Sequence, residues 1–410
     1  MNNKLNDNWH LKRHDRFRKL LYYPVKLFAK MKDGFITEVS DEIPKGPAII
    51  LSNHLTTYDP INLCLSFKET VYTVTTDDVF NKKLAGWFLK TYLNPIPKSK
   101  SVSDLKCVKT ILKVLKEGYK VALFPEGNRS YTGTLCNVSD SIAKLCKVAK
   151  CPIIIFNMEG GYAVDPRWGN KHRKGEVHCT LRKVISKEEA QSYSSEELYN
   201  VIVENLTTSP YKYPIAKRNK RIAEYLERAI YYCPNCDSFE TINSHIDKVY
   251  CLKCGFELKY NHDMTFELIK GEKEIKTVEE WYNIQTKKME SFDPFTIDGK
   301  IFEDYGVTLY SVVRFRRKKP IIKNGHLVMT NKEIYIEGQH KKTILPIETI
   351  REGCVVMKNK ANFYVEDYLY QLKGRVRFSA LKYVQLYHHI KNIRNDESKE
   401  GEFFGLWWSQ

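Results

Sequence analysis

The chain has 410 residues, 42% hydrophobic and 28% charged, so it can form more than one apolar core. This composition excludes collagen-like, low-complexity and wholly disordered proteins. Lysine and arginine exceed aspartate and glutamate by 66 to 49, and the formal net charge of +17 favours an anionic partner such as nucleic acid, phospholipid headgroups or a phosphorylated substrate.

Cysteine usage and hydropathy indicate the compartment. The chain has 11 cysteines, four of them in two Cys-x-x-Cys pairs, which fits a reducing cytoplasm better than secretion. The sequence shows no signal peptide and no run of about 18 uncharged apolar residues, so we expect no membrane-spanning helix. We predict a cytoplasmic protein, peripheral on the inner face of the cell membrane.

The first predicted element is a basic amphipathic helix within residues 9–35, interrupted at Pro24. Cations such as Arg13 and apolar residues such as Phe17 recur at roughly helical spacing. Such a helix can lie at the headgroup boundary of an anionic membrane, or it can pack on the core of its own domain. Periodicity does not distinguish these two surfaces.

Residues 46–185 alternate between short β-branched runs and longer helical patterns, which predicts a layered α/β fold. The expected strands are Ala48–Ser52, Val71–Thr75, Lys120–Phe124 and Pro152–Phe156. The expected helices are Val79–Tyr92, Ser103–Glu117 and a helix that begins after Ser194 with a capping box to Glu197.

After about residue 212 the pattern changes. A basic helix around residues 217–221 is expected before the cysteine pairs, and antiparallel strands are expected beyond Tyr305, closed by a helix. These strands are Val307–Phe315, His326–Thr330, Glu333–Glu337, Lys342–Pro346, Gly353–Met357 and Phe363–Leu372, and the helix is Ser379–Ile393. We divide the chain into 1–225, 226–262 and 263–410.

The cysteine pairs predict a metal site. Cys233 and Cys236 are separated from Cys251 and Cys254 by the 14 residues 237–250. Two thiolates three positions apart can hold one face of a tetrahedral zinc, and a second pair completes a closed, structural site. The spacing resembles that of zinc ribbons, so we expect zinc as a structural cofactor. A redox role is the alternative.

A histidine and an aspartate follow the first strand of the α/β region. His54 and Asp59 are five positions apart at a predicted strand-to-helix junction. There the carboxylate can fix the imidazole tautomer and leave the other nitrogen free as a general base. The spacing alone is weak evidence, because His10 and Asp15 share it. A structural histidine is the alternative interpretation of His54.

Three further segments carry candidate substrate contacts. The loop Phe124-Pro125-Glu126-Gly127-Asn128-Arg129-Ser130 follows the third strand. Gly127 allows close backbone approach, Arg129 offers a fork for phosphate, and Glu126 can order that cation or bind a polar group. The others are Asn94-Pro95-Ile96-Pro97-Lys98-Ser99-Lys100 and Cys151-Pro152-Ile153-Ile154-Ile155. Two later stretches, Gly160-Gly161-Tyr162 and Asp165-Pro166-Arg167-Trp168, can line the site, but we favour a turn-rich surface loop.

Taken in chain order, the segment with His54 and these three segments resemble the blocks of glycerolipid acyltransferases typified by 1-acylglycerol-3-phosphate acyltransferases. The first block, Asn-His-x4-Asp, is complete, and the third, Phe-Pro-Glu-Gly-Thr-Arg-Ser, differs only at Asn128. The second departs from the pattern because Asn94 replaces Gly and Lys100 replaces Arg. In the fourth, Ile155 stands where a second proline is common. The resemblance covers roughly residues 20–205.

The resemblance implies that residues 1–225 transfer an acyl group from acyl-CoA or acyl-carrier protein to a lysophospholipid, most simply 1-acylglycerol-3-phosphate. His54 would deprotonate the acceptor hydroxyl and Asp59 would hold the imidazole. Lys100 and Arg129 would anchor the phosphate beside Gly127, and Glu126 would position the glycerol. No organic cofactor beyond the donor is implied.

Residues 263–410 resemble a PH- or GRAM-like module, which we expect to be an accessory domain. Two alternatives remain for the whole chain: a zinc-ribbon nucleic-acid-binding protein, or a lipid-binding scaffold without catalysis. Residues 237–250 carry three acidic side chains against one lysine, so nucleic acid is not the expected partner. The expected partners are an anionic membrane surface, the lysophospholipid and the acyl donor.

Overall fold

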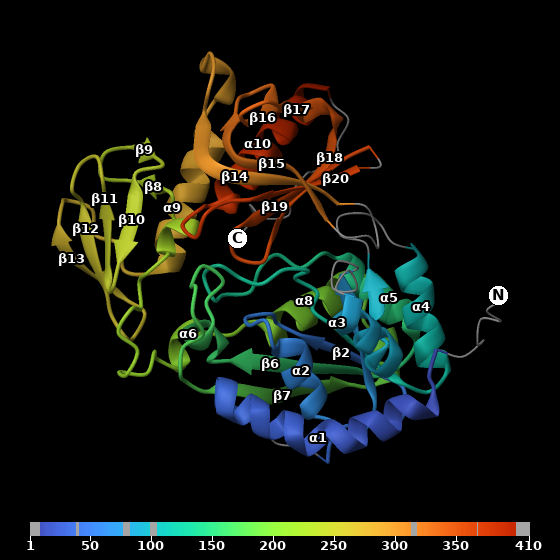
Figure 1. The fold of residues 1–410 in the computed structure, drawn as a ribbon. Helices are drawn as coiled ribbons and strands as arrows, with labels where there is room; N and C mark the ends of the chain where they lie inside the picture. The colour runs from blue at the N-terminus through green and yellow to red at the C-terminus, as the bar shows by residue number, and fades with distance from the viewer. Residues whose placement is uncertain are drawn as a thin grey trace. The chain divides into compact units, whose positions relative to one another are not determined.

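The computed structural model describes residues 9–37, 41–76, 83–98, 105–312, 318–366 and 368–398 (Figure 1). Its contacts divide the chain into two units. The first runs to Pro166 and resumes over Arg173–Tyr213, and the second contains Arg167–His172 and the chain from Pro214 onward. The division into three domains made from the sequence stays a prediction. No helix among the described residues is long and apolar enough to cross a membrane.

Within the described residues, the first unit contains a seven-stranded sheet in the order β1-β7-β6-β2-β5-β3-β4. Neighbouring strands are parallel except for β6 and β7, which are antiparallel. The predicted α/β layering is therefore confirmed. The strands are β1 Phe35–Thr37, β2 Ile49–Ser52, β3 Val71–Thr76, β4 Ile96–Lys98, β5 Lys120–Leu123, β6 Ile153–Glu159 and β7 Val177–Ile185.

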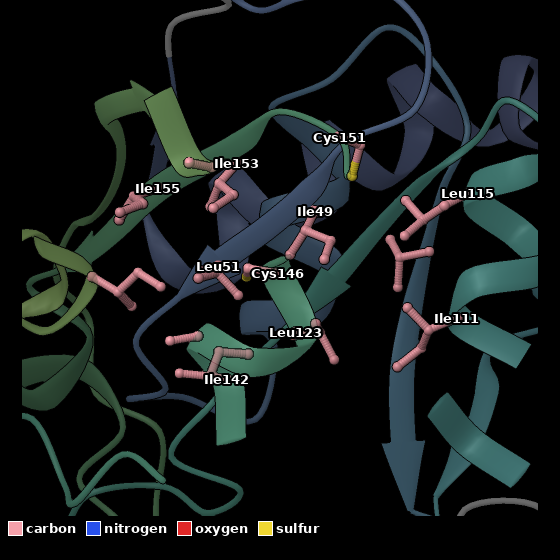
Figure 2. Packing of buried hydrophobic residues seen from close by; sticks show 14 of the residues in the cluster. Ile49, Leu51, Ile111, Leu115, Leu123, Ile142, Cys146, Cys151, Ile153 and Ile155 are labelled. Atoms are coloured by element: carbon pink, nitrogen blue, oxygen red, sulfur yellow. The ribbon is translucent and has the colours of Figure 1, made fainter. Parts of the chain in front are cut away.

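Helices cover both faces of this sheet. Because side chains alternate along a strand, Ile49 and Leu51 of β2 join the core under α4, α5 and α8, whereas Ile50 faces α1 and α2 (Figure 2). The helical elements are α1 Lys12–Asp33, α2 Asp59–Leu65, α3 Lys83–Phe88, the π-helix η2 Leu89–Leu93, α4 Leu105–Lys116, α5 Ser141–Ala149, α6 Gly161–Val164, α7 Lys187–Ser192, α8 Ser195–Leu206 and η3 Pro210–Lys212.

Helix α1 does not break at Pro24, so the expected interruption is wrong. Contacts with the domain hold the helix on both sides of the proline. Before it, Arg18 donates to the carbonyl of Phe67 at 3.1 Å, and Tyr22 donates to that of Leu65 at 3.0 Å. Beyond it, Ala29 is buried in the core. Tertiary packing therefore outweighs the helix hydrogen bond that proline removes.

In the second unit, the part of the chain that the structure describes forms two antiparallel sheets and a short hairpin. The cysteine region holds the hairpin β8 Tyr232–Cys233 and β9 Ser238–Phe239, and the four-stranded sheet of β10 Ile242–His245, β11 Lys248–Cys251, β12 Glu257–Tyr260 and β13 Phe266–Lys270. The predicted small cysteine module and the β-rich region that follows it are both present.

The larger sheet has the strand order β17-β16-β15-β14-β20-β19-β18, and α10 packs against β18 and β19. Tyr387 of α10 donates a hydrogen bond to the carbonyl of Ile350 at 2.9 Å. The elements are η4 Leu226–Arg228, α9 Val278–Ser291, η5 Pro294–Thr296, β14 Phe302–Val312, β15 Lys319–Met329, β16 Glu333–Glu337, β17 Lys342–Pro346, η6 Ile347–Thr349, β18 Ile350–Val356, β19 Lys360–Val365, β20 Tyr368–Lys373 and α10 Ala380–Ser398.

Two expectations for this unit are wrong. The basic segment 217–221 is not a helix, because its flanks are tied to the cysteine region: Ile215 N–H donates to the His262 carbonyl, and Ala223 N–H donates to that of Ile246. The single strand expected over 363–372 is the hairpin of β19 and β20. Glu366 follows β19 with a φ of 50°, in the left-handed region that is typical of a turn.

Candidate active site and metal centre

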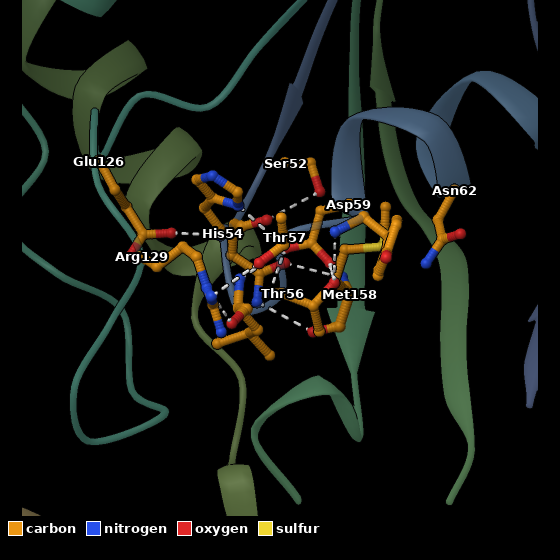
Figure 3. Close-up of polar contacts among 12 residues, drawn as sticks. Ser52, His54, Thr56, Thr57, Asp59, Asn62, Glu126, Arg129 and Met158 are labelled. Atoms are coloured by element: carbon orange, nitrogen blue, oxygen red, sulfur yellow. Dashed lines mark hydrogen bonds and ion pairs between the residues drawn. The ribbon is translucent and has the colours of Figure 1, made fainter. Parts of the chain in front are cut away.

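The loop between β2 and α2 carries the candidate base. Asn53, directly after β2, is buried and ties this loop to β6, because its side-chain amide donates to the Met158 carbonyl at 3.0 Å and its amide oxygen accepts from Met158 N–H at 2.7 Å. His54 follows, and Asp59 is the first residue of α2. The predicted strand-to-helix junction is present (Figure 3).

His54 and Asp59 are in direct contact. The distance between His54 Nδ1 and Asp59 Oδ2 is 3.0 Å. The Asp59 carboxylate is fully buried and also accepts from the backbone N–H groups of Leu55 and Thr56 and from the Thr56 hydroxyl, at 2.5–2.7 Å. These donors stabilise the ionised carboxylate. Because a carboxylate only accepts, Nδ1 of His54 is the donor.

The other ring nitrogen of His54, Nε2, has different surroundings. Nε2 of His54 has no hydrogen-bond partner among the residues that the structure describes, and 19% of the side-chain surface is exposed. The ring also packs against Phe124, with 4.6 Å between ring centroids. A neutral His54 therefore presents an unprotonated nitrogen that a substrate proton can reach.

Glu126 reaches this loop through the main chain. Its Oε1 accepts from the His54 backbone N–H at 2.5 Å, and its Oε2 accepts from Cys136 N–H at 2.8 Å. Burial raises the pKa of the Glu126 carboxyl to about 8, although these two N–H groups oppose the shift. Glu126 thus supports the backbone that carries the histidine.

Gly127 forms the turn that follows Glu126. Its φ of 65° lies in the left-handed region, where a side chain would be strained. A Cβ added here would meet no atom of the described residues within 4 Å. The close approach of a ligand to this backbone stays a prediction.

The Arg129 side chain is bound by the protein. Its Nε donates to the Leu55 carbonyl at 2.9 Å and its Nη1 to the Thr57 hydroxyl at 2.9 Å. Its Nη2 pairs with Asp165 Oδ2 at 3.0 Å. Lys100, the other expected phosphate contact, lies outside the described residues.

Thr57 was not among the residues expected at the site, and the surface loop favoured for residues 165–168 is wrong. Asp165 and Trp168 are both buried. A turn-rich composition predicts exposure, but it does not show that a carboxylate 108 residues from Thr57 will contact it. The available signal was the acidic residue soon after the last block.

The four cysteines of the second unit converge. The Sγ atoms of Cys233, Cys236, Cys251 and Cys254 lie within 4.8 Å of one another. Cys233 and Cys254 are 3.8 Å apart, and Cys236 and Cys251 are 3.7 Å apart. Zinc–sulfur bonds of about 2.3 Å in a tetrahedron place sulfurs about 3.8 Å apart, whereas a disulfide needs about 2.05 Å. The cluster fits a structural metal.

His10 and Asp15, which have the same five-residue spacing as His54 and Asp59, are also in contact. His10 Nε2 lies 3.2 Å from Asp15 Oδ2. Its Nδ1 lies 2.9 Å from the Tyr72 hydroxyl, and the ring stacks on Tyr119 with 4.0 Å between centroids. Both ring nitrogens contact protein atoms, so this histidine has no nitrogen left for a substrate proton.

Known acyltransferases are similar to part of this chain. The chain is 23% identical over 201 residues to a chloroplastic 1-acyl-sn-glycerol-3-phosphate acyltransferase of Brassica napus. This match covers 47% of this chain and 58% of the relative. It is 29% identical over 149 residues to a chloroplastic enzyme of the same description from Arabidopsis thaliana, with coverages of 34% and 42%. The chain thus spans about half the length of these curated relatives.

A solved structure is also similar, that of the 1-acyl-sn-glycerophosphate acyltransferase PlsC from Thermotoga maritima. It is 21% identical, with a TM-score of 0.39, and the match covers 48% of this chain and 82% of that chain. Residues 35–159 match the family model described as Acyltransferase. This matched segment carries His54, Asp59, Glu126 and Arg129.

Proposed function

We propose that the chain transfers an acyl group from acyl-CoA or acyl-carrier protein to the hydroxyl of a lysophospholipid, with 1-acylglycerol-3-phosphate as acceptor and phosphatidic acid as product. The observation that carries this proposal is the pair of His54 and Asp59, in which one ring nitrogen is held by a buried carboxylate and the other is open. The acyltransferase match over residues 35–159 supports the same reaction class.

His54 Nε2 takes the proton of the acceptor hydroxyl while that oxygen attacks the carbonyl carbon of the thioester. The C–S bond then breaks, and the leaving thiolate takes the proton from the imidazolium. Asp59 stays ionised, keeps the ring in the required tautomer and stabilises its positive charge. The acceptor hydroxyl is itself the nucleophile, so no protein nucleophile is needed.

The acceptor's phosphate is proposed to lie beside Gly127 and to be contacted by Arg129 and Lys100. No atom of the described residues lies within 4 Å of a Cβ added at Gly127, which supports this position. Lys100 would add a point charge, whereas the guanidinium of Arg129, held by Leu55, Thr57 and Asp165, supplies a positive charge in a fixed position. Glu126 acts on the glycerol part indirectly, because both of its oxygens hold backbone N–H groups of the site.

The proposed membrane contact is the outer face of α1. Leu20, Tyr23, Leu27 and Met31 recur at helical spacing and are all exposed. The flanking residues Lys19, Lys26 and Lys30 lie on the same helix. Exposed apolar residues beside cations favour the surface of an anionic bilayer. The opposite face of α1 packs on the core of its own domain.

The proposed metal is zinc, held by Cys233, Cys236, Cys251 and Cys254. Four sulfur ligands leave no position for water, so the ion stabilises the second unit and takes no part in acyl transfer. Metal analysis of purified protein should find about one zinc per chain, and none in Cys233→Ser. Metal-free wild-type protein with an unchanged melting temperature would exclude a structural zinc.

An acyl-transfer assay tests the function. Purified, zinc-loaded protein is given acyl-CoA or acyl-carrier protein with lysophosphatidic acid, monoacylglycerol or glycerol 3-phosphate, in mixed vesicles. We expect ester formation to be fastest with lysophosphatidic acid. If no acyl transfer above the uncatalysed rate occurs to any of these acceptors, the proposed function is wrong.

A further inference from the structure

Asp165 is a buried carboxylate next to the candidate phosphate contact. It directly follows α6, and only 5% of its side-chain surface is exposed. Neither the spacing of the four sequence blocks nor the proposed chemistry uses it. Its position therefore needs a separate explanation.

The contacts of Asp165 join two loops of the site. Its Oδ2 pairs with Arg129 Nη2 at 3.0 Å and accepts from the backbone N–H and the hydroxyl of Thr57, at 3.3 and 3.2 Å. Thr57 belongs to the loop that carries His54, whereas Arg129 belongs to the loop after β5. The Arg129 side chain is itself 12% exposed, so this pair is only weakly screened by water.

This pairing changes what Arg129 offers to a phosphate. An isolated guanidinium presents a full positive charge, but Asp165 places a compensating negative charge within 3.0 Å of it. An incoming phosphate meets repulsion from Asp165 as well as attraction to Arg129. The hydrogen bonds to Leu55 and Thr57 meanwhile keep the guanidinium in place, so its orientation does not depend on Asp165 alone.

We propose that Asp165 is a specificity-determining residue, the counter-ion of Arg129 that limits how tightly the acceptor subsite binds a phosphate group. It keeps the arginine preoriented and lowers the affinity of the subsite for phosphate. This inference rests on the proposed function for its biological meaning, but the charge balance can be tested without any acyl transfer.

The direct test measures binding of inorganic phosphate to the full chain by titration calorimetry. Asp165→Asn removes the negative charge and retains an oxygen that can accept a hydrogen bond, so the affinity for phosphate should rise on the order of tenfold. Arg129→Gln together with Asp165→Asn should abolish this gain. Asp140→Asn removes an exposed carboxylate of the same unit and should leave the affinity unchanged.

Activity gives a second readout. Asp165→Asn should lower KM for lysophosphatidic acid and leave KM for monoacylglycerol, which lacks phosphate, unchanged. A merely structural role would move both KM values or lower kcat for both acceptors. If Asp165→Asn does not fold, Asp165→Ser, which is also neutral and smaller, makes the same change of charge.

The outcomes separate this inference from the proposed function. The inference is wrong if the Asp165→Asn variant binds phosphate with an affinity within twofold of wild type, or too weakly to measure. It is also wrong if the gain in affinity persists in the double variant. Wild-type protein that transfers no acyl group, but whose variants bind phosphate as expected, overturns the proposed function alone.

Discussion

Two histidine–aspartate pairs with the same sequence spacing lie in the first unit, and their surroundings differ. In each pair, a glutamate accepts from the histidine backbone N–H: Glu117 for His10 and Glu126 for His54. Both nitrogens of the His10 ring contact protein atoms, and 40% of the Asp15 side chain is exposed. The corresponding carboxylate at His54, that of Asp59, is fully buried.

This difference shows what turns a contact into a candidate catalytic group. Spacing brings each aspartate to its histidine, but the environment decides what the ring can do. At His10 the second nitrogen is occupied by the Tyr72 hydroxyl, so the pair fastens the start of α1 to β3. At His54 the second nitrogen has no partner among the described residues. Both nitrogens of the first ring are therefore engaged, whereas the second ring keeps one nitrogen open, and we propose proton transfer only for the second pair.

Among the substitutions that distinguish the two pairs, the largest effect on activity is expected at the aspartates. Asp59→Asn removes the negative charge that stabilises the imidazolium of His54, while its amide oxygen can still accept from the backbone N–H groups of Leu55 and Thr56. We expect kcat for acyl transfer to fall by about 10³-fold. Asp15→Asn is the matched control and should stay within about threefold of wild type. Equal losses in both variants would contradict the distinction between the pairs.

Glu126 predicts a pH dependence of stability. The pKa of Glu126 is raised to about 8, so between about pH 4.5 and pH 8 the folded protein holds a proton that the unfolded chain releases. The free energy of unfolding should therefore fall as pH rises through this window, by on the order of 3 kcal/mol from this group.

Denaturant unfolding at a series of pH values measures this effect. Glu126→Gln, which cannot ionise, should flatten the pH dependence between pH 5 and pH 8. Glu117→Gln is the matched control, because this carboxylate also accepts from a histidine backbone N–H but is less buried. An unchanged slope in Glu126→Gln would show that the buried carboxyl does not titrate in this range.

The region that His10 fastens is expected to serve the membrane surface. Leu27→Asp places a charge on the exposed face of α1 and should weaken flotation with vesicles that contain anionic lipid by about tenfold. Val148→Asp, at an exposed apolar position on α5, is the control and should not weaken it. Wild-type binding that is insensitive to salt would remove the electrostatic part of this proposal.

The smallest effect is expected from His10 itself. His10→Ala removes the contacts with Tyr72 and Asp15 and the stacking on Tyr119, so it should lower the free energy of unfolding by about 1–2 kcal/mol. Chemical denaturation measures this loss. A stability equal to that of wild type would show that the pair does not hold the start of α1.

How much the sequence predicts depends on the range of the contact. The contact of His54 with Asp59 and the grouping of the four cysteines follow from local spacing, and the structure contains both. The burial of Asp165 and its contact with Thr57 come from the packing of distant segments, which a single sequence does not display. For the same reason, Pro24 does not end α1, because contacts with distant parts of the domain hold the helix on both sides of the proline.

We propose that His54, and not His10, takes the proton of the acceptor hydroxyl. The most direct measurement is kcat/KM for acyl transfer to lysophosphatidic acid in His54→Ala and His10→Ala, with both variants confirmed to be folded. We expect kcat/KM to fall by about 10³-fold or more in His54→Ala and to change by less than about threefold in His10→Ala. Comparable activity in the two variants, or wild-type activity in His54→Ala, would contradict it.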